Sequence, residues 1–370
     1  MSGRFRPIRN CSSSDSVTRP RTSLCRSLLA WYDENRREMP WRGHPDAYAV
    51  WVSEIMLQQT QVETVRGYFQ RFIDAFPTVA ALAAAPQQRV LKAWEGLGYY
   101  SRARNLQKAA QAVMAQGGVL PDTSGAWAAL PGVGPYTAAA IASICFGEFA
   151  PVVDGNVIRV FARYLGLGDD FRKPAARAKL AAWLSPHIEA SKRPGDFNQA
   201  MMDLGATLCA PRAPDCGACP LSRECVAKRE RRQLEFPVKP PKKAVPVRQA
   251  VAVLVRDGEG RVLFAKRTEE GLLSGLWELP GLEVSRKPAR GAARLALRRV
   301  CGLSAECVER CGEVTHVFSH FKLLLHVYAM SGCSGVLDPA RHDSLRFASP
   351  DELPLSTATR RALELAGESV

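Results

Sequence analysis

Four cysteines lie close together in the chain: Cys209, Cys216, Cys219 and Cys225. Their spacing, C-x6-C-x2-C-x5-C, covers 17 residues and is interrupted by prolines and a glycine. Four thiolates on one short loop suit either a tetrahedral zinc ion or a [4Fe–4S] cluster. Zinc sites usually pair two CxxC motifs, and this loop has one. The spacing therefore favours the cluster and leaves zinc or unligated thiols as alternatives.

Two carboxylates stand in apolar surroundings far apart in the sequence. Glu54 lies in WVSEIMLQQT, and Asp154 lies in PVVDGNV just before an apolar-periodic helix. A lone helical glutamate usually faces solvent, and an aspartate in this position is usually an N-cap. A buried glutamate, however, gains the raised pKa of a general acid, and an aspartate bound by helix amides stays ionised. Together they could break a glycosidic bond through an oxocarbenium-like state.

Two glycine turns suggest contact with nucleic acid. In LPGVGPYTA, Gly132 and Gly134 can expose backbone amides at the start of a helix, the helix–hairpin–helix pattern that binds a DNA phosphate without base specificity. In GLGYYSRARN, paired aromatics that include Tyr99 precede two arginines. This second turn is typical of an intercalating wedge, and equally of a loop closed by a packed tyrosine.

The elements that must position these residues are helical from Leu24 to about Val226, with no convincing alternating strand. Apolar residues from Trp51 to Phe76 recur at three- and four-residue steps, which predicts one long amphipathic helix ended by Pro77. Further helices are expected at 87–95, 101–116, 135–146, 156–165, 175–190 and 196–208. Residues 1–22 are predicted to be a flexible tail.

The composition changes after residue 227. Residues 228–248 are basic and Pro-rich, which predicts an extended interdomain linker too polar to bury. Beyond it, strands are expected at Val251–Val255, Val262–Ala265 and Phe321–Tyr328, with a helix at Ala289–Val300. This alternation predicts an α/β domain over 249–367, after a helical domain over 23–227 whose cysteine loop spans 209–225.

Charge and composition restrict the function classes. Fifty Lys and Arg against 36 Asp and Glu give a net charge of +14, which makes a polyanionic partner plausible. Hydrophobic content of 46% excludes a mainly disordered chain, and no apolar run reaches the length of a membrane span. Eleven cysteines without an apolar signal segment indicate a reducing compartment. We expect a cytoplasmic, bacterial, nucleoid-associated protein, with a mitochondrial presequence as the alternative.

Five ordered motifs over residues 24–226 resemble one family. WVSEIMLQQTQV, GLGYYSRARNL, LPGVGPYTAAAI, VDGNVIRV and FNQAMMDLGATLC are similar to the helix–hairpin–helix DNA glycosylases related to endonuclease III, and within them to the adenine DNA glycosylases. The cysteine loop fits the [4Fe–4S] spacing of that family. The resemblance implies a monomeric enzyme that flips adenine out of 8-oxoguanine·adenine or guanine·adenine mispairs in double-stranded DNA and cleaves it from its sugar.

The resemblance also implies residue roles. Glu54 would protonate adenine at N7, and Asp154 would stabilise the sugar cation, either electrostatically or as a covalent partner. Tyr136 and Asn156 would orient these carboxylates and the nucleophile. The residues expected to contact DNA or the lesion are Arg42 and Gln58 at the adenine pocket, Gln59 and Tyr99 beside 8-oxoguanine, Thr60, and the hairpin glycines Gly132 and Gly134.

Tyr136 also distinguishes two kinds of chemistry. Relatives in this superfamily that nick DNA carry a lysine at the position of Tyr136. A phenol cannot form a Schiff base with the abasic sugar. The sequence therefore predicts a monofunctional glycosylase with little or no lyase activity.

The C-terminal region resembles a Nudix fold through GLWELPG at 275–281. When the Nudix box is laid from Gly281, its last glycine falls on Gly302, but its acidic positions become Lys287, Ala296, Arg299 and Val300. These four residues cannot hold Mg2+ against a pyrophosphate, so we expect the fold without the hydrolase.

The string HVFSH resembles the F-S-H loop of the family, in which Ser319 and His320 would sense 8-oxoguanine beside Phe318. The alternative is a core Phe318 and a strand-end His320. The rival functions are a thymine- or pyrimidine-directed glycosylase, a nucleotide pyrophosphatase and a non-catalytic DNA-binding protein. The predicted fold class is multidomain: an all-α helix–hairpin–helix glycosylase domain with a cluster loop, followed by an α/β Nudix-like domain.

Overall fold

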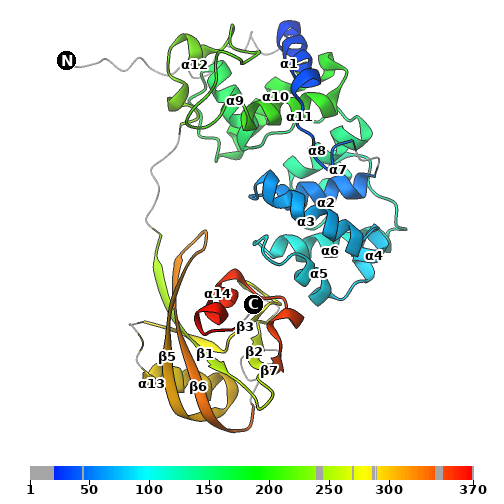
Figure 1. Cartoon of the computed structure of the whole chain (residues 1–370). Coiled ribbons are helices and arrows are strands. Elements are labelled where there is room, and N and C mark those ends of the chain that lie inside the picture. The colour runs from blue at the N-terminus through cyan, green and yellow to red at the C-terminus, as the bar shows by residue number, and fades with distance from the viewer. Residues whose placement is uncertain are drawn as a thin grey trace, which may run out of the picture. The chain divides into compact units, whose positions relative to one another are not determined.

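The computed structural model describes residues 21–43, 46–238, 245–268, 271–285, 288, 290–337 and 345–368. Most of the predicted tail lies outside these ranges. By their contacts, the described residues form two compact units (Figure 1). The first lies within Met1–Phe69 and Ala112–Pro241, and the second lies within Gln70–Gln111 and Lys242–Val370. This division places residues 70–111 with the C-terminal part, so it cuts across the predicted helical domain.

The described residues of the first unit form helices joined by turns and loops, without a strand. Its elements are α1 (Thr22–Asn35), α2 (Ala47–Leu57), the larger part of α3 (Val62–Ala75), α7 (Ser124–Ala128), α8 (Pro135–Phe146), α9 (Gly155–Leu165), α10 (Pro174–Ser191), α11 (Pro194–Ala206), α12 (Val226–Arg229) and the 3-10 turn η1 (Gln233–Glu235). A core of α1, α9, α10 and α11 is built around Phe161, Leu184 and Phe197. This core fixes the start of α9, where Asp154 lies.

The single long helix predicted from Trp51 to Phe76 is wrong. Helix α2 ends at Leu57 and α3 begins at Val62. Gln59 has a φ of 59°, a left-handed conformation that cannot continue a right-handed helix. The apolar period continues on both sides of the break, so periodicity alone concealed it.

The predicted extended linker is wrong for its first part. Its residues begin within α12 and η1, and Phe236 packs into the core of the first unit with 3% of its surface exposed. The Arg163 guanidinium donates to the carbonyl oxygens of Gln233 and Phe236, so these polar groups are satisfied. Residues 239–244 of the linker lie outside the described residues.

The second unit combines the end of α3 and three further helices with the C-terminal domain. Its elements are α4 (Val79–Ala84), α5 (Gln87–Ala93), α6 (Ser101–Ala115), β1 (Val247–Val255), β2 (Val262–Lys266), β3 (Trp277–Glu278), β4 (Gly281–Val284), α13 (Arg290–Cys301), β5 (Leu303–Val317), β6 (Lys322–Gly335), β7 (Leu345–Ala348), the 3-10 turn η2 (Pro350–Glu352) and α14 (Thr357–Leu365). Residue 111 is the division point within α6.

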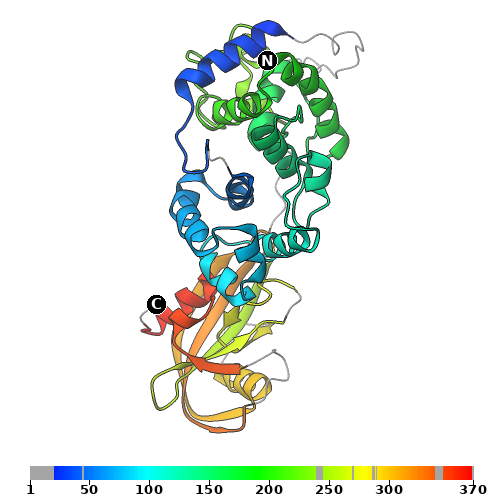
Figure 2. The same ribbon diagram turned by 90° about the vertical axis from the view of Figure 1, so that its right-hand side faces the viewer.

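The C-terminal domain is a mixed α/β fold. One sheet has the order β4-β1-β6-β5 and the other β3-β2-β7, and β1 runs parallel to β6. Alternate residues of β1 face opposite sides: Val251 and Val253 pack with α13, whereas Ala252 and Leu254 pack with α14. Figures 1 and 2 accordingly show these helices on opposite sides of the sheets.

Two predicted strands lie within β1 and β2, the third begins one residue before β6 and otherwise lies within it, and the predicted helix overlaps α13. The long strand β5 was missed. Its exposed and buried residues do not alternate regularly, and its register with β6 shifts between Arg310 and Gly312.

Candidate active site and DNA interface

Residues from three separated segments line one cavity of about 170 Å³ in the first unit. Glu54 comes from α2, Tyr136 from α8, and Asp154 and Asn156 from the start of α9. The four side chains predicted to perform catalysis are thereby brought together. Arg42 and Thr60 line the same cavity.

Glu54 is buried, with 5% of its surface exposed, because the surrounding residues of α2 are buried too. The Tyr136 hydroxyl donates to its Oε2 at 2.9 Å. Burial raises the pKa of Glu54 to about 7, and the charge of Asp154 adds to this, against the opposing effects of Tyr136 and Arg42. Glu54 is therefore a carboxyl that can hold a proton near neutral pH and release it to a base.

Asp154 serves as the N-cap of α9. Its carboxylate accepts from the Val157 amide at 2.7 Å and from Asn156 Nδ2 at 2.9 Å. Burial raises the pKa of Asp154 above its ordinary value, and these hydrogen bonds oppose that rise without cancelling it. The N-cap position and the cavity position belong to the same side chain, so the two interpretations weighed from the sequence are compatible.

Arg159 holds Asn156 in place. Its Nη2 donates to Asn156 Oδ1 at 2.8 Å and to the Gly205 carbonyl at 2.7 Å, and its Nε donates to the Cys209 carbonyl at 2.8 Å. The cavity and the first cysteine of the loop are therefore joined through one guanidinium. Sequence reasoning did not single out Arg159, although it lies within the quoted string VDGNVIRV.

Asp203 is a second residue that the sequence analysis missed. It is fully buried in α11 and binds two arginines, Arg37 Nη2 at 2.6 Å and Arg42 Nη1 at 2.7 Å. Arg42 also donates from Nε to Gln199 Oε1 at 2.9 Å. Arg42 therefore forms part of the cavity wall with its guanidinium engaged by α11. Asp203 lies within the quoted string FNQAMMDLGATLC, where a single aspartate among apolar residues could have indicated a buried ion pair.

The break between α2 and α3 carries three of the predicted lesion contacts. Gln58 Nε2 donates to Thr137 Oγ1 at 3.1 Å, which ties the end of α2 to α8. Thr60 lines the cavity, and Gln59 is exposed in its left-handed conformation. An exposed polar side chain beside the cavity is placed to meet a ligand that enters it.

The hairpin turn before α8 has the geometry that its sequence predicts. Gly132 is exposed and has a φ of 76°, and the Val133 amide donates to the Leu130 carbonyl at 3.2 Å. Gly134 is the N-cap of α8, and Pro135 is its first residue. An exposed glycine turn therefore lies directly before the start of α8, and the starts of helices favour anions such as phosphate.

The four cysteines line one pocket between the end of α11 and α12. Arg163 Nη1 donates to Cys209 Sγ at 3.3 Å, and Gln233 Nε2 donates to Cys216 Sγ at 3.6 Å. Within the described ranges, no group of three or more His, Cys, Asp or Glu side chains is arranged to hold a metal ion. The donor chemistry nevertheless fits a thiolate-bound group, because four sulfurs share one pocket and hydrogen-bond donors reach two of them.

The remaining predicted contacts lie in the second unit. Tyr99 is 45% exposed and left-handed, with a φ of 47°. In the loop between β5 and β6, the Phe318 amide donates to the Phe321 carbonyl at 2.9 Å, and Ser319 and His320 are exposed. Phe318 is half-buried, and its ring packs against those of His316 and Phe321.

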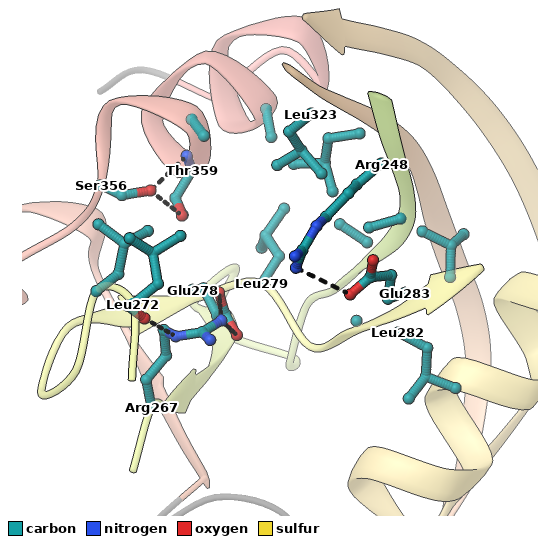
Figure 3. Close-up of a pocket in the computed structure, with 18 of the residues that line it drawn as sticks. Arg248, Arg267, Leu272, Glu278, Leu279, Leu282, Glu283, Leu323, Ser356 and Thr359 are labelled. Carbon is teal, nitrogen blue, oxygen red and sulfur yellow. Dashed lines mark hydrogen bonds and ion pairs between the residues drawn. The ribbon is translucent and has the colours of Figure 1, made fainter. Parts of the chain in front are cut away.

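Phe318 and Phe321 also line a cavity of about 330 Å³ between the sheet and α14. Figure 3 shows two guanidinium–carboxylate pairs there: Arg267 with Glu278 and Arg248 with Glu283. The Arg248 guanidinium lies 4.5 Å from the centre of the Phe321 ring.

Of the residues at the Nudix acidic positions, the three that the structure describes, Ala296, Arg299 and Val300, do not line this cavity. Ala296 and Val300 are buried against the sheet on α13, and Arg299 is exposed. Lys287 lies outside the described residues.

No helix in the described ranges is long and apolar enough to cross a membrane.

Comparison with known proteins identifies both parts of the chain. Residues 52–186 match the HhH-GPD superfamily base excision DNA repair protein model, and residues 251–365 match the NUDIX domain model. A solved thermostable thymine-DNA glycosylase is 29% identical with a TM-score of 0.50, and the match covers 56% of this chain and 95% of that one. The predicted fold class, helical and then Nudix-like, is confirmed.

Curated relatives match across both parts. The adenine DNA glycosylase of Homo sapiens is 39% identical over 84% of this chain and 67% of its own length, and that of Mus musculus is 40% identical over 84% and 71%. The adenine DNA glycosylase of Buchnera aphidicola is 35% identical over 81% of this chain and 83% of its own. Because these matches extend through the helical and Nudix-like parts alike, the chain belongs to the adenine DNA glycosylase family.

Proposed function

We propose that this enzyme removes adenine from 8-oxoguanine·adenine and guanine·adenine mispairs in double-stranded DNA. The observation that carries the proposal is the shared cavity in which the protonatable Glu54, held by Tyr136, meets Asp154 and Asn156. A flipped nucleotide in this cavity would place its glycosidic bond between an acid and an anion, which is what cleavage requires.

The reaction follows from the protonation states. Glu54 donates its proton to N7 of adenine, so the base can leave with the electron pair of the bond between C1′ and N9. The sugar becomes an oxocarbenium-like cation, which the Asp154 carboxylate stabilises. Water then adds to C1′ and loses a proton, to give an abasic site and free adenine. Tyr136 and Asn156 hold the two carboxyls at 2.9 Å each.

The cavity favours base removal without strand cleavage. A lyase step needs an amine that forms a Schiff base with the abasic sugar. The described lining of the cavity contains arginines but no lysine. Tyr136 lines this cavity and donates a hydrogen bond to Glu54. We therefore assign a monofunctional glycosylase.

We assign the cofactor as a [4Fe–4S] cluster held by Cys209, Cys216, Cys219 and Cys225. The cluster would cross-link the loop through its four thiolates. The loop in turn helps to position the residues that line the cavity. Arg159 donates to the Cys209 carbonyl and to Asn156, so a displaced loop would disturb the support of Asp154.

Lesion recognition is assigned to exposed side chains. Ser319 and His320 lie on an exposed loop, and Tyr99 and Gln59 are exposed on left-handed backbone. Hydrogen-bonding groups on such positions can reach the edge of a damaged base, and an aromatic ring can insert between bases. The net charge of +14 favours the DNA backbone without base specificity.

The deciding experiment is excision from a labelled duplex with one 8-oxoguanine·adenine pair, followed by hot alkali. We expect strand scission only after alkali, and free adenine in the supernatant. Scission without alkali would contradict the monofunctional assignment. Excision of thymine but not adenine from a panel of mispairs would contradict the substrate.

A further inference from the structure

The turn that carries Tyr99 is strained and exposed, so something must hold it. It joins α5 to α6, and Gly96, Gly98 and Tyr99 have φ values of 95°, 69° and 47°. A non-glycine residue in the left-handed region persists only where its surroundings fix it. The Tyr99 ring itself is 45% exposed and cannot provide that support by burial.

One support comes from within the helical segment. The buried Arg102 guanidinium donates to the carbonyls of Leu97 and Gly98 at 3.0 Å each. Its carbon Cζ lies 5.7 Å from the centre of the Tyr99 ring. Trp94 Nε1 also donates to the Gly98 carbonyl at 3.2 Å. These contacts hold the turn through donors from the same helical segment.

The other support comes from the Nudix-like domain, within the same compact unit. The Tyr100 hydroxyl accepts from the Gly96 amide at 3.3 Å and donates to the Leu355 carbonyl at 3.0 Å. Leu355 is fully buried in the core of that domain. One phenol oxygen therefore links the first glycine of the turn to a rigid part of the C-terminal domain.

Neighbouring contacts strengthen this link. Lys92 Nζ donates to the Leu353 carbonyl at 3.0 Å, and Glu95 is paired with Arg360 of α14 and with Lys92. On the far side of the turn, Arg104 Nη1 donates to the Ser274 carbonyl at 2.7 Å. Charged side chains on both sides of residues 96–100 thus bind backbone or side chains of the Nudix-like domain.

We propose that residues 353–360 of the Nudix-like domain hold the turn at residues 96–100, and that Tyr100 is the positioning residue through which they orient the Tyr99 ring. The inference rests on the proposed insertion of Tyr99 beside 8-oxoguanine. It gives the Nudix-like domain a second route to lesion recognition, separate from the loop with Ser319 and His320.

The test is a double-mutant cycle of Tyr99→Ala and Tyr100→Phe in the full chain. The probe is a duplex with 8-oxoguanine opposite uncleavable 2′-fluoro-2′-deoxyadenosine, and the measurement is its dissociation constant. We expect Tyr99→Ala to weaken binding about tenfold, from lost stacking. Tyr100→Phe should weaken it about fivefold, because the turn loses both hydrogen bonds of the Tyr100 hydroxyl, to Gly96 and to Leu355. In the Tyr99→Ala background, Tyr100→Phe should cause no further loss.

A matched control separates positioning from general damage. Tyr328→Phe removes another tyrosine hydroxyl that donates to a carbonyl, that of Pro288 at 3.0 Å, in the same domain. It should leave the dissociation constant unchanged. A 2-aminopurine placed beside 8-oxoguanine reports unstacking directly, and its fluorescence gain on binding should fall in Tyr100→Phe but not in Tyr328→Phe.

The outcomes are distinguishable. If Tyr99→Ala binds as tightly as the parent, the insertion role in the proposed function fails. If Tyr99→Ala weakens binding and Tyr100→Phe weakens it equally in both backgrounds, or not at all in the parent, the positioning role is overturned while the function stands.

Should Tyr100→Phe not fold, Arg360→Gln provides the same test. It should weaken binding about threefold in the parent background only, as expected for one partly exposed ion pair. Its control is Arg346→Gln, which removes another ion pair of this domain, with Glu352, and should change nothing. Equal effects of the two arginine variants would overturn the proposal.

Discussion

The cavity proposed for catalysis and the surfaces proposed for lesion recognition differ in their exposure to solvent. Glu54 is almost fully buried, and its pKa is raised to about 7 because water is excluded. Tyr99, Ser319 and His320 are instead exposed to solvent. Proton transfer needs a buried site in which the pKa of the acid is shifted. Recognition needs an exposed side chain that can contact a base and whose orientation is fixed.

The two regions are therefore supported differently. In the cavity, side chains hold one another: Tyr136 binds Glu54, Asn156 binds Asp154, and Arg159 binds Asn156. On the recognition turn, the backbone is held, by Arg102 from one side and Tyr100 from the other. Variants in the cavity should accordingly lower the rate of adenine excision. Variants on the exposed surfaces should lower the preference for 8-oxoguanine·adenine over guanine·adenine.

The largest effect is expected for Glu54→Gln. The amide keeps the shape and a hydrogen bond to Tyr136 but cannot donate a proton to N7, so single-turnover excision should fall about 10³-fold. The dissociation constant for the mispaired duplex should stay within about threefold of the parent value, since Glu54 contributes chemistry rather than affinity. Glu63→Gln, on an exposed surface of α3, serves as the control. Full activity of Glu54→Gln would refute the assignment of the acid.

Asp154→Asn should come next. Asparagine also caps helices, so α9 should stay folded and the melting temperature should change little. The lost charge should slow single-turnover excision about 10²-fold, through weaker stabilisation of the sugar cation. A large drop in melting temperature with an unchanged rate in the folded fraction would show that Asp154 is an N-cap only.

A smaller effect is expected when Ser319→Ala and His320→Ala are combined. Excision from 8-oxoguanine·adenine should slow, whereas excision from guanine·adenine should not, so the ratio of the two rates should narrow about tenfold, as for one or two lost base contacts. An unchanged ratio would remove the recognition role from this loop and leave the cavity untouched.

The smallest effect is a shift along the pH axis. Because the proposed mechanism requires protonated Glu54, and burial raises its pKa to about 7, excision should decline as the pH rises through that value. Tyr136→Phe removes a hydrogen bond that lowers the pKa of Glu54, so the decline should move to higher pH. Single-turnover rates from pH 5.5 to 9 would measure it, and a shift to lower pH would contradict the arrangement.

Local motifs were sufficient for much of this description. The hairpin glycines, the cysteine loop and the helices at 135–146 and 156–165 could be predicted because each depends on residues that are neighbours in sequence. The break at Gln59 could not, since the apolar period continues on both sides of it. The burial of Phe236 was also missed, because its neighbours in sequence are charged and its partners are far away.

The sequence by itself determined the chemistry of the candidate site: an acid on one helix, an anion at the start of another, a phenol where a lyase has an amine, and four thiols on one loop. Only the tertiary structure decided how these groups behave. Three properties arise between segments that are distant in sequence. They are the raised pKa of Glu54, the ion pair of Arg42 with Asp203 and the hydrogen bond from Tyr100 to Leu355. Burial and hydrogen bonding are properties of the packed chain, and no local pattern of residue types specifies them.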